Sequence, residues 1–124
     1  MKRDMELIRT ILLNVEDGKY AYGRRIHVDG VSLDVCAYHV ALMQDVGLVD
    51  AKVIQSSDSP TAAALIFRLT SAGHDFCDGI RQDTIWNKAK EHILKPGASY
   101  GLSVFVEWVK LEVHQRVFGV PPSS

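Results

Sequence analysis

A helical pattern changes to a strand pattern within Tyr38-His39-Val40-Ala41-Leu42-Met43-Gln44-Asp45-Val46-Gly47-Leu48-Val49. The first part of this stretch continues an apolar helical pattern that begins after Ser32, whose side-chain oxygen can accept an unpaired N–H at a helix start. Gly47 tolerates the left-handed backbone conformation that commonly ends a helix, and Leu48 opens a run typical of a strand. We therefore predict a helix over residues 32–46, a turn at Gly47 and a strand that starts at Leu48.

The residues on either side of this stretch predict further helices and strands. The expected helices cover residues 3–16, 71–81, 85–94 and 99–118, with Asp17-Gly18 ending the first and Thr70, Asp83-Thr84 and Ser99 capping the others. The expected strands cover residues 24–28, 48–55 and 63–69, and the last two form a hairpin around a polar loop at 56–60. This order predicts an α+β fold, a winged helix-turn-helix with a small antiparallel wing sheet and two additional C-terminal helices.

The length and composition indicate one ordinary globular domain. The chain has 124 residues, 47% of them hydrophobic and 23% charged, which is enough to build a single core without a metal or a disulfide. We expect a winged-helix core over residues 1–70, appended helices over 71–119 and a frayed tail at 120–124. The 14 Lys and Arg and 15 Asp and Glu give a formal charge of −1, so the net charge favours neither nucleic acid nor acidic membranes.

The composition also bears on where the protein works. Its longest apolar run, residues 62–67, is far shorter than a membrane span, and no apolar signal segment follows the basic start of the chain. The two cysteines, Cys36 and Cys77, are too few to indicate a disulfide-stabilised secreted scaffold. We expect a cytoplasmic protein with reduced thiols, no contact with a membrane and no cofactor.

Several segments resemble a known family. Residues 38–49 resemble the end of a winged-helix recognition helix running into its wing, and Leu69-Thr70-Ser71-Ala72-Gly73-His74-Asp75-Phe76 resembles the segment that leaves the wing in many bacterial regulators. The opening Met1-Lys2-Arg3-Asp4-Met5, with Ile80-Arg81-Gln82-Asp83-Thr84 and Trp86-Asn87-Lys88, is similar to an uncharacterised bacterial and phage family of small winged-helix-like proteins, a domain of unknown function. The resemblance implies a winged-helix fold and a bacterial or phage source, and it implies no activity.

Two non-enzymatic roles fit this fold. As a DNA-binding transcriptional regulator, the protein would place the helix at 32–46 in the major groove of double-stranded DNA. The candidate contacts are Lys2, Arg3, Arg24 and Arg25 to phosphates, and Tyr38 and Gln44 to base edges. That helix has no Lys or Arg, and it carries Asp34 and Asp45. The alternative is a protein–protein interaction or adaptor module, such as a phage modulator or an antitoxin-like protein, that does not bind DNA directly.

Residues able to bind metals or catalyse reactions give weaker signals. Cys36 with His39, and His74 with Cys77, are each spaced so that a sulfur and an imidazole share one helix face, which could supply a tetrahedral zinc site. The simpler prediction is that no metal binds, that the cysteines are buried and that both histidines make buried hydrogen bonds. The sequence has no phosphate-binding glycine loop, nucleophile elbow or paired-carboxylate motif, so we expect no enzymatic activity.

The expected last helix is apolar on two sides. One stripe can pack against the rest of the domain, whereas the second contains Val104, Trp108, Leu111 and Phe118. Facing water, the second stripe would form a larger apolar patch than soluble monomers usually carry. We predict that it forms a homodimer interface, and the alternative is that both stripes are buried within the domain against residues 85–94.

Overall fold

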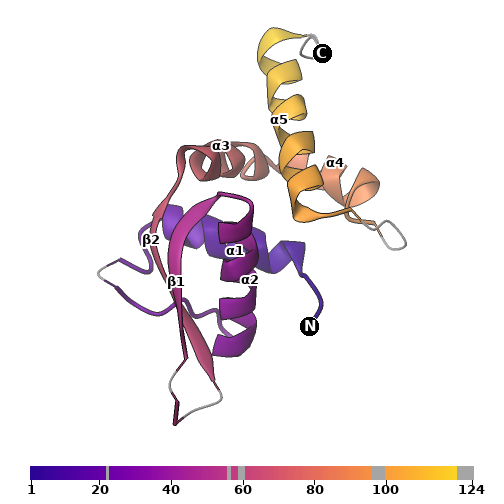
Figure 1. Ribbon diagram of the computed structural model, residues 1–124. Coiled ribbons are helices and arrows are strands. Elements are labelled where there is room, and N and C mark those ends of the chain that lie inside the picture. Colours follow the sequence, from indigo (N-terminus) through magenta and orange to yellow (C-terminus); the bar gives the residue numbers. More distant parts are fainter. Residues whose placement is uncertain (22, 56, 59–60, 96–99, 120–124) are drawn as a thin grey trace. The chain divides into compact units, whose positions relative to one another are not determined.

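A computed structural model describes residues 1–21, 23–55, 57–58, 61–95 and 100–119 of the chain. These ranges form an α+β structure of five helices and a two-stranded antiparallel hairpin (Figure 1). In chain order the elements are α1 (Met5–Glu16), α2 (Leu33–Asp45), β1 (Val49–Gln55), β2 (Ala62–Leu69), α3 (Ser71–Ile80), α4 (Asp83–His92) and α5 (Leu102–Phe118). The predicted α+β class is confirmed, and so is the predicted order of these helices and of the hairpin.

The chain divides into two compact units. Unit 1 covers Met1–His74 and holds α1, α2, the hairpin and the start of α3. Unit 2 covers Asp75–Ser124 and holds the rest of α3 with α4 and α5. The division lies close to the predicted boundary between the core at 1–70 and the appended helices. That the two parts form one domain stays a prediction.

Unit 1 is built on α2, which packs against both strands, and on α1, which packs against α2 and β2. Local signals in the sequence fix where these elements start and stop. Ser32 Oγ accepts a hydrogen bond from the backbone N–H of Val35 at 3.4 Å, and Thr70 Oγ1 accepts one from Gly73 at 3.0 Å. Gly47 ends α2 with φ 77°. The two predicted caps and the predicted turn are therefore confirmed.

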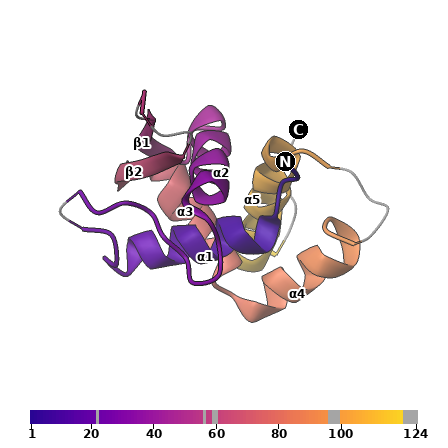
Figure 2. The same ribbon diagram turned by 90° about the horizontal axis from the view of Figure 1, so that it is seen from below.

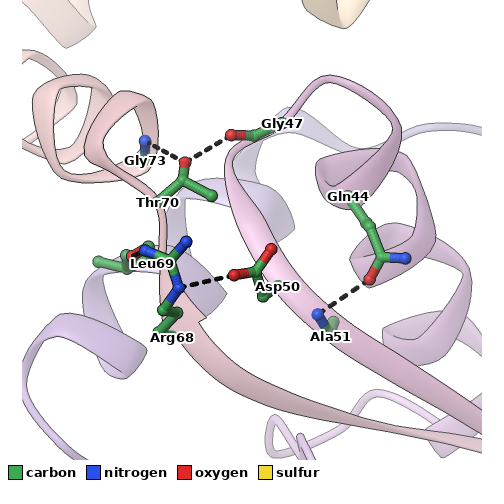
Figure 3. A network of polar contacts seen from close by, with 8 residues as sticks. All are labelled: Gln44, Gly47, Asp50, Ala51, Arg68, Leu69, Thr70 and Gly73. Atoms are coloured by element: carbon green, nitrogen blue, oxygen red, sulfur yellow. Dashed lines mark hydrogen bonds and ion pairs between the residues drawn. The ribbon is translucent and has the colours of Figure 1, made fainter.

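The hairpin contains a β-bulge near its open end. Asp50 pairs with Arg68 whereas Ala51 pairs with Ile66, so Phe67 is the extra residue on β2. The Arg68 guanidinium also forms an ion pair with Asp50, with Nε and Oδ2 2.6 Å apart (Figure 3). A bulge disrupts the ladder locally and bends its strand. Phe67 at this bulge is 65% exposed.

The predicted strand around Ile26 is wrong. Its residues take no strand conformation, and one backbone hydrogen bond, from Ile26 N to Ala64 O at 2.9 Å, joins them to β2. The Ile26 side chain is buried, whereas the preceding Arg24 and Arg25 are exposed. A strand needs a repeated ladder of such bonds. The apolar residue therefore reaches the core without its neighbours joining the sheet.

Unit 2 departs from the prediction at the start of α4. The helix begins at Asp83 rather than at Ile85, and Gln82 takes the extended N-cap position without a side-chain hydrogen bond. Asp83 thus lies inside the first turn, where its carboxylate meets the positive end of the helix dipole. The predicted cap of α5 at Ser99 is wrong, because the helix begins at Leu102 and Gly101 is its N-cap residue. Ser99 itself and the predicted tail at 120–124 lie outside the described residues. Within the described ranges, no helix has the length and apolar character needed to cross a membrane.

Candidate functional site

The N-terminal arm, residues 1–4, is fixed to α2 by a buried histidine. The backbone N–H of Asp4 donates to His39 Nε2 at 2.8 Å, and His39 Nδ1 lies 2.7 Å from the carbonyl oxygen of Val35. A carbonyl oxygen only accepts, so Nδ1 carries the proton and Nε2 is the acceptor. Asp4 Oδ1 also accepts from the N–H of Leu7 at 3.2 Å and caps α1. The prediction of buried hydrogen bonds is confirmed for His39.

Replacing His39 with leucine is expected to lower the free energy of unfolding by about 1–3 kcal/mol, because the N–H of Asp4 loses its acceptor in a part-buried position. Amide exchange at Asp4 should become faster for the same reason. Urea unfolding followed by circular dichroism measures the first effect, and NMR amide exchange measures the second.

Tyr38→Phe is the matched control for this substitution. Tyr38 is 37% exposed, and its hydroxyl has no hydrogen-bond partner among the described residues. The control should change the unfolding free energy by less than about 0.5 kcal/mol. If His39→Leu and Tyr38→Phe unfold at the same urea concentration, His39 does not hold the arm.

The exposed side of α2 carries few groups able to read DNA. Gln44 Oε1 accepts a hydrogen bond from the N–H of Ala51 at 2.9 Å (Figure 3). At the other end of the helix, Asp34 Oδ1 accepts one from the N–H of Ala62 at 2.5 Å. Both side chains therefore hold a strand of the hairpin against α2. The sequence alone does not predict this role, because it depends on contacts between residues that are far apart in the chain. Of the two predicted base contacts, Gln44 has its amide oxygen engaged, whereas the Tyr38 hydroxyl has no hydrogen-bond partner within the described residues.

The four basic residues proposed for phosphate contacts do not gather in one place. Lys2 and Arg3 precede α1, whereas Arg24 and Arg25 lie in the connection that follows it, and α1 is about 18 Å long. Figures 1 and 2 both show that this connection starts at the end of α1 opposite to the N-terminus. Acidic side chains also slightly outnumber basic ones in unit 1. This separation makes it less favourable for the four basic residues to bind phosphates as one surface.

The outer edge of β1 is open at Val53. Ala64 lies opposite Val53 in the ladder, and its carbonyl oxygen accepts a hydrogen bond from the N–H of Ile26, on the side of β2 away from β1. The backbone groups of Ala64 therefore point away from β1. Opposite residues in an antiparallel ladder either exchange both hydrogen bonds or direct both backbone groups outward. Val53 therefore directs its N–H and C=O away from β2. Ala51 does the same, since its N–H donates to Gln44.

The side chains around this edge are also accessible. Val53 is 45% and Ile54 43% exposed, and they point to opposite faces of the strand. Among the residues that the structure describes, the sheet consists of β1 and β2, so no third strand covers the edge. Lys52 is exposed beside them, as lysines on sheet edges often are. The sequence alone does not reveal this site, because apolar strand residues are usually assigned to the core.

The possible zinc ligands do not assemble. Cys36 and His39 lie in unit 1 and are buried, and His74 is exposed with its Nδ1 4.0 Å from a carboxylate oxygen of Glu16. The prediction of a buried hydrogen bond is therefore wrong for His74. Burial raises the pKa of the Cys36 thiol, against a smaller lowering by the backbone of Val28. In the described part of the chain, no group of three or more His, Cys, Asp or Glu could hold a metal ion.

The residues predicted for a dimer interface lie on α5. Val104, Leu111 and Phe118 are exposed, and Trp108 is half-buried with its ring 6.5 Å from that of Phe105. The opposite side of the helix buries Leu102, Phe105 and Val109 within unit 2. The second apolar stripe is therefore not buried within unit 2.

Comparison with known proteins shows the family of this chain. The family described as "Hypothetical protein (DUF2513)" matches residues 2–99, from the N-terminal arm through both strands and α4. A protein of Haemophilus influenzae described as "Uncharacterized protein" is 37% identical over 119 residues, which cover 94% of this chain and 99% of that protein. No solved structure matches the chain. The chain belongs to the DUF2513 family.

Proposed function

We propose that this protein is a non-enzymatic winged-helix module that binds another protein, and that the partner adds an extended segment to the open edge of β1. The winged-helix topology is supported by the order of α1, a connecting segment bonded to β2 through Ile26, α2 and the hairpin. The connection between α1 and α2 spans residues 17–32, longer than the short turn of a helix-turn-helix. This departure makes a DNA-reading role for α2 less favourable.

One observation carries the proposal, namely the outward backbone groups of Val53 on a strand edge that no described segment covers. An unpaired N–H and C=O on an edge strand can accept an extended chain through main-chain hydrogen bonds. Exposed Val53 and Ile54 provide apolar contacts on both faces for alternate side chains of that segment. The phosphates of DNA offer neither an extended main chain for these hydrogen bonds nor apolar side chains for these contacts.

The test replaces Val53 with proline. Because the N–H of Val53 faces away from β2, proline removes the donor on the open edge and leaves the β1–β2 ladder intact. A display library of short random peptides, selected on the immobilised wild-type protein, provides the probe. Peptides selected in this way should bind the Val53→Pro protein about tenfold or more weakly, as expected for one lost hydrogen bond with its partner left unsatisfied.

Two further variants make the result interpretable. Val53→Thr keeps the N–H and the branched side chain and should bind the selected peptides as the wild type does. Ile54→Pro removes an N–H directed toward β2 and should lower stability, which checks the register from which the proposal is drawn. Peptides that bind Val53→Pro and the wild type equally well would overturn the proposal.

Double-stranded DNA is the competing partner, and one observation favours it. The hydrogen bond between Asp4 and His39 holds Lys2 and Arg3 next to the turn of α2 that carries Tyr38. Anisotropy titrations with a mixed-sequence duplex at ~50 mM salt measure this binding where electrostatic contacts are strongest. We expect no duplex binding at micromolar protein. Binding that is weakened by Lys2→Ala with Arg3→Ala, but not by Arg24→Ala with Arg25→Ala, would replace the proposal with DNA binding through the arm.

A further inference from the structure

The two sides of α5 differ in what covers them. On one side, Phe105 and Val109 are fully buried in unit 2. The same side is tied to α4 by polar contacts, since Lys88 Nζ lies 3.0 Å from Glu112 Oε1, and Arg116 donates to Thr84 Oγ1 at 2.7 Å. The exposed side chains of Val104, Leu111 and Phe118 lie on the other side of the helix, away from these contacts.

The uncovered side carries a stripe of exposed apolar side chains at helical spacing. Val104 is 46%, Leu111 47% and Phe118 66% exposed, and each lies seven residues from the next, two turns along the helix. No Lys, Arg, Asp or Glu occupies these three positions. An apolar stripe without charges along a helix is typical of a surface that another helix covers.

We infer that this stripe pairs with the same stripe of a second copy of the chain, with the two α5 helices antiparallel and a two-fold axis passing at Leu111. Such an axis places a residue that precedes Leu111 in one copy level, along the helix pair, with the residue that follows Leu111 by the same number of positions in the other copy. Val104 of one copy then meets Phe118 of the other at each end, and the two Leu111 side chains meet at the centre. Apolar side chains of one copy therefore meet apolar side chains of the other along the whole stripe.

The residues that flank the stripe also match in this arrangement. Glu107 and His114 lie on one flank, so the antiparallel pairing places each carboxylate beside the imidazole of the other copy. Trp108 and Gln115 lie on the other flank, so an amide oxygen comes within reach of an indole N–H. A parallel pairing has its two-fold axis along the helices and would instead bring each Glu107 to the Trp108 flank of the other copy, away from His114. The charges thus select a second copy in one orientation.

Mass measurement by light scattering at ~50 μM protein, above the dissociation constant of most stable dimers, tests the pairing. The wild-type chain should have the mass of two copies, and Leu111→Glu should have the mass of one, because the two-fold axis brings the two carboxylates together. Val117→Glu is the matched control, since Val117 is 67% exposed on the same helix but lies off the stripe. The control should keep the mass of two copies.

A cysteine cross-link checks the position of the axis and does not depend on a disruptive substitution. Leu111→Cys should form a disulfide-linked dimer under mild oxidation, whereas Val117→Cys should not, and the native Cys36 and Cys77 are buried. A wild-type mass of one copy, a Leu111→Glu protein that keeps the mass of two, or cross-linking that is equally efficient at both positions would each overturn the inference. None of these results depends on whether a peptide or a duplex binds unit 1.

Discussion

Gly73→Ala should lower the free energy of unfolding by about 3 kcal/mol or more, at the upper end of what overpacking costs. Gly73 is buried in the first turn of α3, and a Cβ atom there would lie 2.0 Å from the backbone oxygen of Leu48 and 3.0 Å from its carbonyl carbon. The obstacle is backbone rather than the end of a flexible side chain. Alanine therefore cannot be accommodated by a change of rotamer.

The surrounding hydrogen bonds oppose a shift of the two segments. The N–H of Thr70 donates to the same Leu48 oxygen at 3.0 Å, and Thr70 Oγ1 accepts from Gly73 and donates to the carbonyl of Gly47 (Figure 3). Moving α3 and its cap residue Thr70 away from the Gly47–Leu48 turn would lengthen the two bonds that Thr70 makes to Gly47 and Leu48. Each net loss adds roughly 1 kcal/mol to the cost of relieving the clash.

Urea unfolding monitored by far-ultraviolet circular dichroism measures the Gly73→Ala effect. Gly101→Ala is the control, since a Cβ at Gly101 would meet only the Ser103 hydroxyl at 4.0 Å and the backbone there has no positive φ. Gly101 is the N-cap residue of α5, so the control should cost no more than about 1 kcal/mol. If the two variants unfold at the same urea concentration, the close approach of α3 to Leu48 is wrong.

The features that the sequence predicted correctly are those that depend on neighbouring residues. Ser32 and Thr70 cap helices because a hydroxyl three residues before an unpaired N–H can reach it, and Gly47 ends α2 because it tolerates a positive φ. The helices and the hairpin follow from periodicity and these boundaries. All of this information lies within a few residues of each element.

The features that the sequence did not predict depend on partners far along the chain. Ile26 has strand-forming neighbours, but whether they join a sheet depends on β2, which supplies one hydrogen bond. Asp34 and Gln44 are ordinary polar helix residues until the hairpin strands come within reach of their oxygens. The open edge at Val53 is likewise a property of the register between two strands. Local propensity contains none of these pairings.

A second large effect is expected in unit 2, where Phe105→Ala should lower the free energy of unfolding by about 3–5 kcal/mol. The Phe105 ring is 1% exposed and lies at the centre of an aromatic cluster. Its centroid is 5.4 Å from that of Phe76 in an edge-to-face arrangement, 5.9 Å from that of Trp86 and 6.5 Å from that of Trp108. Truncation removes a contact with each of these rings and leaves a cavity among them.

The two tryptophans of the chain, Trp86 and Trp108, both lie in unit 2, so their fluorescence reports the unfolding of that unit. Val117→Ala is the control on the same helix and should change the unfolding free energy by no more than about 0.5 kcal/mol, since that side chain is largely exposed. The three rings around Phe105 come from α3, α4 and α5, and no local signal in the sequence joins them. A loss below about 1 kcal/mol in Phe105→Ala would mean that these helices do not share one core, because a fully buried ring cannot be removed from a packed interior at that cost.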